Sequence, residues 1–497
     1  MAIDPAVALP DGLTRDYLLH HRICPVGTTP DGTLRVAVAP DALLDDALDD
    51  LRFVYGRDLV VEPESLADVE RAIERITTRA GRDLELARAE GGDFADDERT
   101  ADVRDLATQP PVVRFVNLLV RDAYDAGASD IHLESTRQGL AVRFRLDGVL
   151  TLAPEPPAEL AHAVVSRIKL LAELDIAERR RPQDGRIRVR FEDRAMDLRV
   201  STVPTLFGES VVLRLLDRGG RPVALDALGM PADVLASVTA LAARPHGMVL
   251  VTGPTGSGKT TTLYAALQRR DTRAEKVITV EDPVEYELDG VTQVPVHRQA
   301  GVTFAAALRS ILRQDPDVVM LGEMRDPETA EVAVQAAMTG HVVFSTLHTN
   351  DAIGAIPRLT DLGVAPYLIA ATLEGVLAQR LVRRICDACR TPDHPDAAQV
   401  AVLASAAGVP TSSTTVTYTR GAGCSACRDT GYHGRLGVFE LFVLSDAIKH
   451  AIASGASRAE LAELARGESM RSLLADGWEK VVAGETTVEE VWRVAQG

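Results

Sequence analysis

A glycine-rich loop between an apolar strand and a helix is the strongest chemical signal in this sequence. Residues 248–252 form the apolar run of a buried strand, and the pattern G-x-x-x-x-G-K-T follows at once. Glycines let backbone N–H groups turn toward phosphate oxygens, and the N-terminus of the following helix adds a partial positive charge. The pattern predicts a phosphate site made of Gly253, Pro254, Thr255, Gly256, Ser257, Gly258, Lys259, Thr260 and Thr261.

Two side chains of this loop have the chemistry that a bound triphosphate requires. The ammonium of Lys259 can reach the β- and γ-phosphates, and the hydroxyl of Thr260 can ligate Mg²⁺. The loop therefore predicts binding of a nucleoside triphosphate with Mg²⁺. Hydrolysis also needs a second metal ligand and a group that activates water.

Acidic side chains follow two further apolar runs. The run 277–280 leads into Glu281 and Glu285, and the run 318–321 leads into Glu323. Ligands of parallel α/β sheets bind outside the carboxyl ends of the strands, so we expect these acids beside the loop. Glu323 fits a Mg²⁺-holding role, directly or through water. Either Glu285 or Glu281 could activate the water, and the sequence alone does not choose between them.

A third apolar run, residues 342–347, has a histidine on each side, His341 and His348. We expect both at the same edge of the sheet, where they could contact or sense a γ-phosphate. Isolated histidines are also common as hydrogen-bonded structural residues, and this alternative stays open.

Four of the five cysteines form two C-x-x-C pairs, Cys386 with Cys389 and Cys424 with Cys427. Four thiolates at this spacing predict a tetrahedral Zn²⁺ site with no position open to water, which makes the zinc structural. A thioredoxin-like redox pair is the alternative, but two pairs in a turn-rich segment argue against it. Cys24 stands alone and is expected to be buried. This cysteine usage is typical of a cytosolic protein with a metal site.

The elements that must position these residues fall into three parts. Residues 1–80 are expected to form a small α/β unit, with a strand at 34–38 and helices over 43–53 and 66–76. Residues 81–107 bring glycines and acidic residues, which predicts a flexible linker. Residues 223–497 alternate strand, loop and helix to about 380, carry the cysteine insertion at about 382–436, and end in helices capped at Ser445 and Thr487.

Between them, residues 108–217 are expected to form an α/β domain. It has a helix over 112–126 and then alternating strands at 140–147, 186–191, 196–201 and 211–215. In these strands arginines alternate with apolar residues, so a meander with one buried and one basic face is predicted. The arginines are either solvated charges or contacts to an anion such as a nucleotide phosphate.

Composition excludes several classes of protein. The chain has 497 residues and a formal net charge of −18, from 54 Lys and Arg against 72 Asp and Glu. This acidity argues against general nucleic-acid binding, which requires phosphate neutralisation. No apolar run approaches the roughly 18–20 residues that span a bilayer. The N-terminal residues have neither the basic nor the apolar region of a secretory signal.

Taken together, the motifs resemble the ATPases of type II secretion and type IV pilus assembly, the GspE/PilB family. The resemblance covers nearly the whole chain. It rests on 128–134 (ASDIHLE), 180–186 (RRPQDGR), the Walker A loop 253–260, the Asp box 281–285 (EDPVE), the Walker B segment 322–326 (GEMRD), the His box from 339–341 (TGH) to 348–350 (HTN), and the tetracysteine insertion.

The resemblance implies a RecA-like P-loop ATPase domain with a zinc-binding insertion, preceded by a PAS-like α/β domain and a small N-terminal α/β domain. It implies a homohexamer that binds ATP, Mg²⁺ and Zn²⁺ and lies on the cytoplasmic face of the inner membrane. Arg199 and Arg214 match the arginines that approach the γ-phosphate in the family, and the family pattern favours Glu285 as the base and Glu323 as the Mg²⁺-linked acid.

Within the family, the chain looks more like the type II secretion branch than the pilus branch. The single small N-terminal unit and the segment TTTLYA at 260–265 carry this preference. The implied partners are the cytoplasmic domain of a GspL-like inner-membrane protein, an inner-membrane platform protein and acidic phospholipid, with no nucleic acid. The alternatives are a type IV pilus extension ATPase, a hexameric nucleic-acid motor and a nucleotide-gated adaptor that does not hydrolyse.

Overall fold

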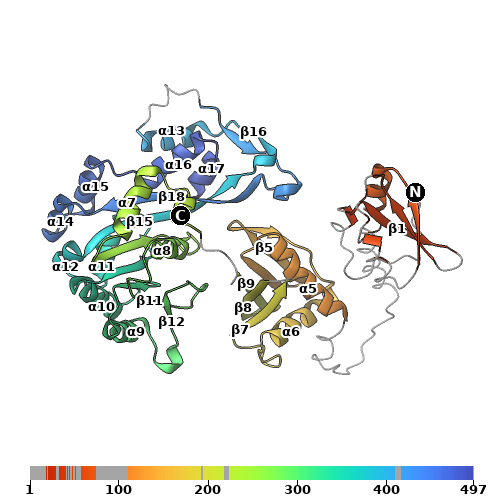
Figure 1. Cartoon of the computed structure of the whole chain (residues 1–497), viewed down its shortest axis with the longest axis horizontal. Helices are drawn as coiled ribbons and strands as arrows, with labels where there is room; N and C mark the ends of the chain where they lie inside the picture. The colour runs from red at the N-terminus through yellow and green to blue at the C-terminus, as the bar shows by residue number, and fades with distance from the viewer. Residues whose placement is uncertain are drawn as a thin grey trace. The chain divides into compact units, whose positions relative to one another are not determined.

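The computed structural model divides into two compact units, residues 1–100 and 101–497 (Figure 1). The predicted linker at 81–107 lies outside the described residues. Among the described helices, none combines the length and the apolar character that crossing a bilayer requires. The described residues are 18–19, 21–29, 33–40, 42, 44, 47–48, 51, 58–73, 76, 110–191, 194–217, 223–408 and 416–495.

The first unit contains a three-stranded sheet of β1 (Ile23–Thr28), β2 (Leu34–Val38) and β3 (Leu59–Pro63). β2 lies in the middle, antiparallel to β1 and parallel to β3. The predicted strand at 34–38 is confirmed, while most of the helix predicted at 43–53 lies outside the described residues. Cys24 is fully buried on β1, as expected, and burial raises the pKa of its thiol to about 12.

The second unit begins with a six-stranded sheet whose order is β6-β5-β4-β9-β8-β7. Two helices, α5 and α6, share one hydrophobic core with one face of this sheet (Figure 1). Arginines occupy the alternating positions on the other face, as the sequence predicts. The elements are α5 (Pro110–Asp125), β4 (Asp130–Thr136), β5 (Gly139–Leu146), β6 (Val149–Leu152), α6 (Ala161–Leu171), β7 (Gln183–Phe191), β8 (Arg194–Thr205) and β9 (Gly208–Asp217).

The expectation of one continuous meander was wrong for this sheet. β7, β8 and β9 do form one, but β4 lies between β5 and β9 and is antiparallel to both. β4 buries only Ile131 and Leu133 completely, and Asp130, His132 and Glu134 alternate with them. Two apolar residues are too short a run for a strand to stand out in the sequence.

A seven-stranded sheet follows, in the order β12-β11-β13-β14-β10-β15-β18. All neighbouring strands are parallel except β15 and β18, which pair antiparallel. The strands are β10 (Gly247–Thr252), β11 (Val277–Glu281), β12 (Thr292–Pro295), β13 (Val318–Leu321), β14 (Val342–Leu347), β15 (Leu373–Ile385) and β18 (Tyr432–Val443).

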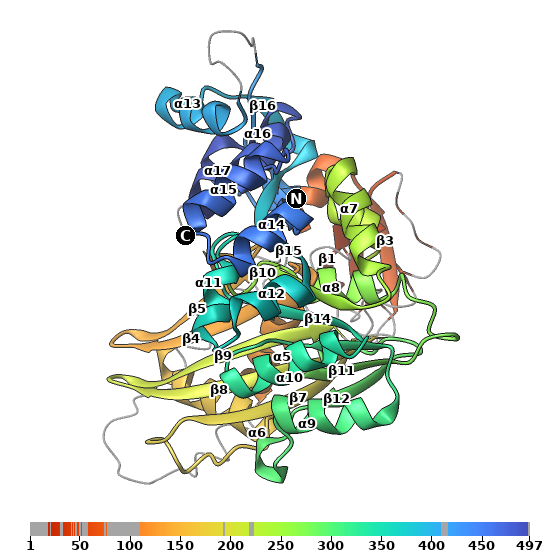
Figure 2. The ribbon, with the colours of Figure 1, turned by 90° about the vertical axis from the view of Figure 1, so that its left-hand side faces the viewer.

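Helices cover both faces of this sheet, which is why its central strands are continuous apolar runs. Alternate strand residues point into two separate cores, one with α9 to α12 and one with α7 and α8. Figure 2 shows α9 and α10 near β11 and β12, and the C-terminal helices near β15. The helices are α7 (Ala232–Ala242), α8 (Lys259–Leu267), α9 (Phe304–Ile311), α10 (Pro327–Met338), α11 (Ala355–Asp361) and α12 (Pro366–Thr372).

The cysteine segment connects β15 to β18 and contains β16 (Arg390–Pro392), α13 (Ala397–Ala406) and β17 (Thr419–Gly421). The chain ends in α14 (Asp446–Ala453), α15 (Arg458–Gly467), α16 (Leu473–Val482) and α17 (Val488–Ala495). Both predicted caps are confirmed. The Ser445 hydroxyl accepts from the N–H of Ile448, and the Thr487 hydroxyl accepts from the N–H of Glu490, each at 3.2 Å.

Candidate functional site

The glycine-rich loop joins the buried strand β10 to α8, and it lies directly against β15. A Cβ on Gly253, whose φ is +150°, would lie 2.5 Å from the carbonyl oxygen of Gln379. A Cβ on Gly258, whose φ is +85°, would lie 2.8 Å from the amide nitrogen of the same glutamine. Both positions therefore exclude other residues, because the neighbouring strand leaves no room and the backbone is left-handed at Gly258.

Lys259 is folded back onto the loop that precedes it. Its Nζ donates to the carbonyl oxygens of Gly253 at 2.8 Å and Pro254 at 3.0 Å. The side chain is only 9% exposed. This burial lowers the pKa of Lys259 to about 8. The negative charge of Glu323 acts to raise the pKa, and the positive charge of Arg380 lowers it by a smaller amount. The ammonium is thus a nearly buried cation inside the loop.

The remaining loop residues differ in exposure. The hydroxyl of Ser257 is buried and has no hydrogen-bond partner within the described part of the chain. Thr260 and Thr261 are half-buried in the first turn of α8, and the exposed residues of the loop are Pro254, Thr255 and Gly256. A buried hydroxyl without a partner fits a loop that binds a polar ligand.

Glu323 lies where the sequence predicts, beyond the carboxyl end of β13. Its Oε2 forms an ion pair with Nε of Arg325 at 2.6 Å and lies 3.4 Å from Nε2 of His348. Its charge also acts on Lys259. The loop lysine, the acid and the histidine are therefore neighbours. Carboxylate and hydroxyl oxygens are the ligands that Mg²⁺ prefers, so Glu323 and Thr260 suit this ion.

His348 follows β14 at the same edge of the sheet. Burial and the nearby charge of Lys259 lower its pKa, although the hydrogen bond to Glu323 opposes them. The ring is therefore predominantly neutral at pH 7, where it can donate one hydrogen bond and accept another.

The expected position of His341 was wrong. His341 precedes β14, and its carbonyl oxygen accepts from the N–H of Gly247, the first residue of β10. β10 and β14 run parallel, so His341 lies at the opposite edge of the sheet from the loop. Its ring Nδ1 lies 2.9 Å from the carbonyl oxygen of Ala336 and 3.1 Å from the hydroxyl of Thr339. These contacts fit the alternative that His341 is a hydrogen-bonded structural residue.

Glu281 and Glu285 have different surroundings. Glu281 is 2% exposed and is held by hydrogen bonds from the hydroxyls of Tyr264 and Thr279 and from the amide of Gln293. These bonds occupy both carboxylate oxygens. Glu285 is half-buried, and burial raises its pKa even though Arg199 and Arg214 act in the opposite direction.

The two predicted arginines come from neighbouring strands of the six-stranded sheet. Arg199 on β8 and Arg214 on β9 are direct cross-strand partners. Both charges act on Glu285, so the structure brings the arginines and this acid into electrostatic range. Arg199 is half-buried, whereas the Arg214 side chain is 54% exposed. The seven-stranded sheet therefore contributes the loop and the acids, and the six-stranded sheet contributes the two arginines.

Two residues beside the loop were missed by the sequence analysis, Gln379 and Arg380 on β15. The Gln379 Oε1 accepts from the hydroxyl of Thr262 at 2.6 Å, and the Arg380 Nη2 donates to the carbonyl oxygen of Asn350 at 2.8 Å. Both side chains are buried. A polar pair that interrupts the apolar run 375–382 is the signal that could have found them.

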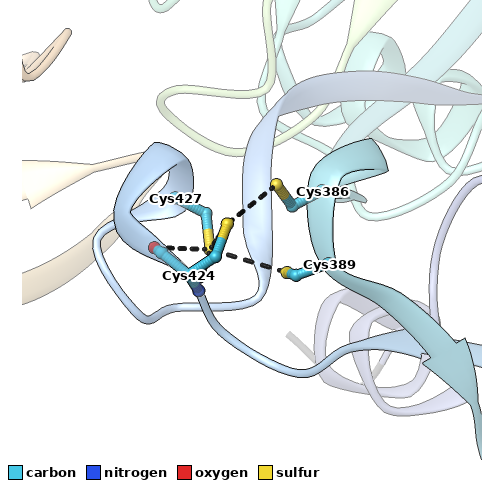
Figure 3. A group of neighbouring side chains, drawn as sticks. All are labelled: Cys386, Cys389, Cys424 and Cys427. Atoms are coloured by element: carbon cyan, nitrogen blue, oxygen red, sulfur yellow. Dashed lines mark hydrogen bonds between the residues drawn. The ribbon is translucent and has the colours of Figure 1, made fainter.

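The four paired cysteines come together, as their spacing predicts (Figure 3). Their Sγ atoms all lie within 4.8 Å of one another, and three of the pairs are separated by 3.9, 3.8 and 3.7 Å. A tetrahedral site with Zn–S bonds of about 2.3 Å has sulfur–sulfur edges of about 3.8 Å. The spacing therefore fits zinc.

Backbone N–H groups also support a thiolate in this cluster. Burial works to raise the pKa of Cys427, but hydrogen bonds from the N–H groups of Cys424 and Gly431, both 3.2 Å long, bring it down to about 7. Hydrogen bonds of this kind stabilise the negative charge that a metal-binding sulfur carries.

Comparison with known proteins decides the family. The model for type II/IV secretion system proteins matches residues 105–493. The chain belongs to the type II/IV secretion system protein family. The MshEN domain model also matches, over residues 1–83. The family match includes the six-stranded sheet, the loop and the cysteine cluster.

Individual members of the type II/IV secretion system family resemble nearly the whole chain. It is 45% identical to the type II secretion system protein E of Xanthomonas campestris pv. campestris, covering 99% of this chain and 86% of that protein. It is 44% identical to the type IV pilus assembly ATPase PilB of Myxococcus xanthus, covering 95% and 84%.

A solved structure of a pilus retraction motor, PilT with bound ADP, has a similar fold. It aligns with a TM-score of 0.51 and 26% identity, and the match covers 76% of this chain and 96% of PilT. The expected P-loop ATPase architecture is therefore confirmed for this member of the type II/IV secretion system family.

Proposed function

We propose that this chain is the motor ATPase of a type II secretion system, which hydrolyses ATP to ADP and phosphate to drive pseudopilus assembly and protein export. Two electrostatic relationships support the proposal: Glu323 acts on the loop residue Lys259, and Arg199 and Arg214 from a separate sheet act on Glu285. Membership of the type II/IV secretion system family, and the relative named type II secretion system protein E, support the choice of machine.

In this proposal the loop residues hold the triphosphate. Lys259 exchanges its two carbonyl acceptors for β- and γ-phosphate oxygens, because charged oxygens are the stronger acceptors. The N–H groups from Gly253 to Thr261 surround the same phosphates. Thr260 and Glu323 would hold Mg²⁺, which when bound screens the charge of the β- and γ-phosphates.

Glu285 acts on water in the proposed hydrolysis. It accepts a proton from a water whose oxygen attacks the γ-phosphorus, while the bond from that phosphorus to the β–γ bridging oxygen breaks. A raised pKa suits a base that must accept a proton near neutral pH. Glu281 is the alternative base, but the bonds that occupy both of its oxygens favour a structural role.

Arg199 and Arg214 bind the γ-phosphate in this proposal. Loss of the phosphate removes the anion that joins the two sheets, and their domains then separate or rotate. The motion is transmitted through a homohexamer to the membrane machine. The proposed partners are a GspL-like cytoplasmic domain, which would bind residues 1–80, a platform protein and acidic phospholipid at the cytoplasmic face of the inner membrane.

A type IV pilus extension ATPase is the second candidate, because the similarity to PilB is nearly as high as that to the secretion protein. The two share their chemistry and differ in the load. A chromosomal Lys259→Ala variant separates them. Loss of protein export with intact pili supports the secretion assignment, whereas loss of pili with intact export supports the alternative.

The hydrolysis itself is tested by phosphate release from the full-length chain, with and without the partner's cytoplasmic domain and acidic phospholipid. We expect turnover that these additions increase and that DNA and RNA leave unchanged. Stimulation by nucleic acid alone would instead support a nucleic-acid motor. A chain that binds ATP but never releases phosphate under any of these conditions would be a nucleotide-gated adaptor.

A further inference from the structure

A row of charged side chains crosses five strands of the six-stranded sheet. Each member stands directly opposite the next, in the order Arg145, Asp130, Arg214, Arg199 and Arg186. Residues in direct register share one face of a sheet, and like charges in that relationship repel. The row holds four guanidinium groups, and its single carboxylate, Asp130, lies beside Arg214.

Asp130 is fixed by its neighbours. Its Oδ1 accepts from Nε of Arg214 at 2.8 Å, and its Oδ2 accepts from the hydroxyl of Ser129 at 2.8 Å and lies 3.7 Å from Nε of Arg145. The Asp130 side chain is 6% exposed. Burial alone would raise the pKa of Asp130, but the bonds from Arg214 and Ser129 outweigh it and keep the carboxylate charged.

The bond to Asp130 leaves part of the Arg214 guanidinium for another ligand. It engages Nε, whereas the two terminal Nη groups form the fork that binds a phosphate in two places. The Arg214 side chain is 54% exposed, although the carboxylate that holds it is nearly buried. The Asp130 carboxylate thus fixes Nε of Arg214, although the Arg214 side chain as a whole is exposed.

We propose that Asp130 is a positioning residue for Arg214: it holds Nε so that the two Nη groups face the triphosphate. This inference rests on the proposed function, because it requires that Arg214 contact the γ-phosphate. Without Asp130, Arg214 would lie between Arg145 and Arg199 with no counter-charge in the row, and it would move away from both. In this proposal Asp130 acts only through Arg214.

The test is a double-mutant cycle on the full-length chain, because coupled residues give non-additive effects. Asp130→Ala and Asp130→Asn are each made alone and together with Arg214→Ala. We expect each Asp130 variant alone to lower kcat by about tenfold, and Arg214→Ala by about a hundredfold. Binding of Mg·ADP, which lacks the γ-phosphate, should change less than twofold. In the Arg214→Ala background the Asp130 variants should cause no further loss.

Glu134→Gln is the matched control. Glu134 lies four residues after Asp130, on the same face of β4, and it is bound to Arg143 at 2.6 Å rather than to Arg214. We expect this variant to keep wild-type turnover. Asp130→Glu, which restores the charge at a longer reach, should recover part of the activity. Thermal midpoints identify any variant that fails to fold, and Asp130→Asn keeps the shape of the side chain if Asp130→Ala does not.

The outcomes separate this inference from the proposed function. Full turnover in Arg214→Ala would remove the arginine from the mechanism and overturn both. Impaired Arg214→Ala with unimpaired Asp130 variants would overturn only the positioning role. An equal loss from Asp130→Asn in both backgrounds would assign Asp130 to the stability of the sheet and also overturn it.

Discussion

The ammonium of Lys259 is hydrogen-bonded to the backbone of Gly253: its Nζ donates to a carbonyl oxygen 2.8 Å away in the same loop. The two residues lie at opposite ends of the phosphate-binding pattern, so the bond closes the loop on itself. A bound phosphate must replace this contact. Nucleotide binding is therefore predicted to exchange one set of lysine hydrogen bonds for another without moving the strand or the helix.

Lys259→Ala should abolish hydrolysis and leave the fold intact. The variant removes the cation that stabilises the β- and γ-phosphates, so we expect at least about a hundredfold loss of turnover. Its thermal midpoint should not fall, because a nearly buried ammonium is costly to desolvate and alanine has no such cost. Phosphate release and thermal unfolding of the purified chain measure the two effects.

Lys276→Ala is the control for this variant. Lys276 is exposed and immediately precedes β11, at the edge of the sheet opposite the loop. It should retain wild-type turnover. Equal activity in the Lys259 variant and this control would remove the loop lysine from the site.

Nucleotide affinity should fall as the pH rises through about 8. The lysine has a pKa of about 8 in the nucleotide-free chain, and a triphosphate or diphosphate binds its charged form. Binding is therefore strongest below that pH and weakens as the proton is lost. For a pKa of about 8, raising the pH from 7 to 9 should cost about tenfold in affinity for Mg·ADP. Titration calorimetry at three pH values measures the trend.

Lys259→Arg provides the reference for the pH series. A guanidinium stays charged throughout this range. The variant should bind Mg·ADP more weakly than the wild type, but its affinity should not fall as the pH rises from 7 to 9. A parallel decline in both proteins would show that some other group titrates.

Glu285→Gln should separate binding from hydrolysis. The amide keeps the size of the side chain but cannot take the proton of the attacking water, so we expect a loss of turnover of roughly 10²–10⁴-fold. Affinity for Mg·ATP should stay within a few-fold. Glu281→Gln is the matched comparison, since it removes a charge that Tyr264 and Thr279 hold by hydrogen bonds. It should lower the thermal midpoint by several degrees.

The opposite pattern would exchange the two roles. If Glu281→Gln lost turnover at an unchanged thermal midpoint and Glu285→Gln remained active, Glu281 would be the base. The hydrogen bonds around it would then have to open in the presence of nucleotide.

The strands around the loop were predictable because burial on both faces requires continuous apolar residues. The predicted runs 248–252 and 318–321 correspond to β10 and β13. The rule that ligands gather at the carboxyl ends of parallel strands also located Glu323 and His348 correctly. The same rule, applied strictly, excludes His341, because that residue precedes its strand.

Other features depend on residues that are distant in the sequence. The distinction between Glu281 and Glu285 is made by Tyr264 and Gln293, which reach Glu281 from α8 and β12. The role of Gln379 arises from its contact with the loop, more than a hundred residues earlier in the chain. Such contacts are set by the packing of the sheet. The local sequence marks Gln379 as a polar residue in an apolar run, but it does not report what the residue contacts.

Zinc removal should loosen the segment between β15 and β18. The wild-type chain is expected to carry one zinc per polypeptide, because the four thiolates form one cluster. Cys424→Ser should lose this metal, as measured by elemental analysis, and should lower the thermal midpoint. Structural zinc contributes about 10 kcal/mol of apparent binding free energy in small domains, so the segment should become sensitive to proteases.

Cys24→Ser is the control for the loss of a thiol, because Cys24 is buried in the first unit and is not part of the cluster. It should keep one zinc per chain.

The strands that bear the cluster continue to Arg380 beside the phosphate loop, with Arg380 paired to Val438 on β18. Mg·ADP affinity in Cys424→Ser therefore reports whether disorder spreads along β15. We expect less than a fivefold decrease, because Gln379 and its neighbours are held by β10 on the other side. A larger decrease would show that the zinc segment supports the loop itself.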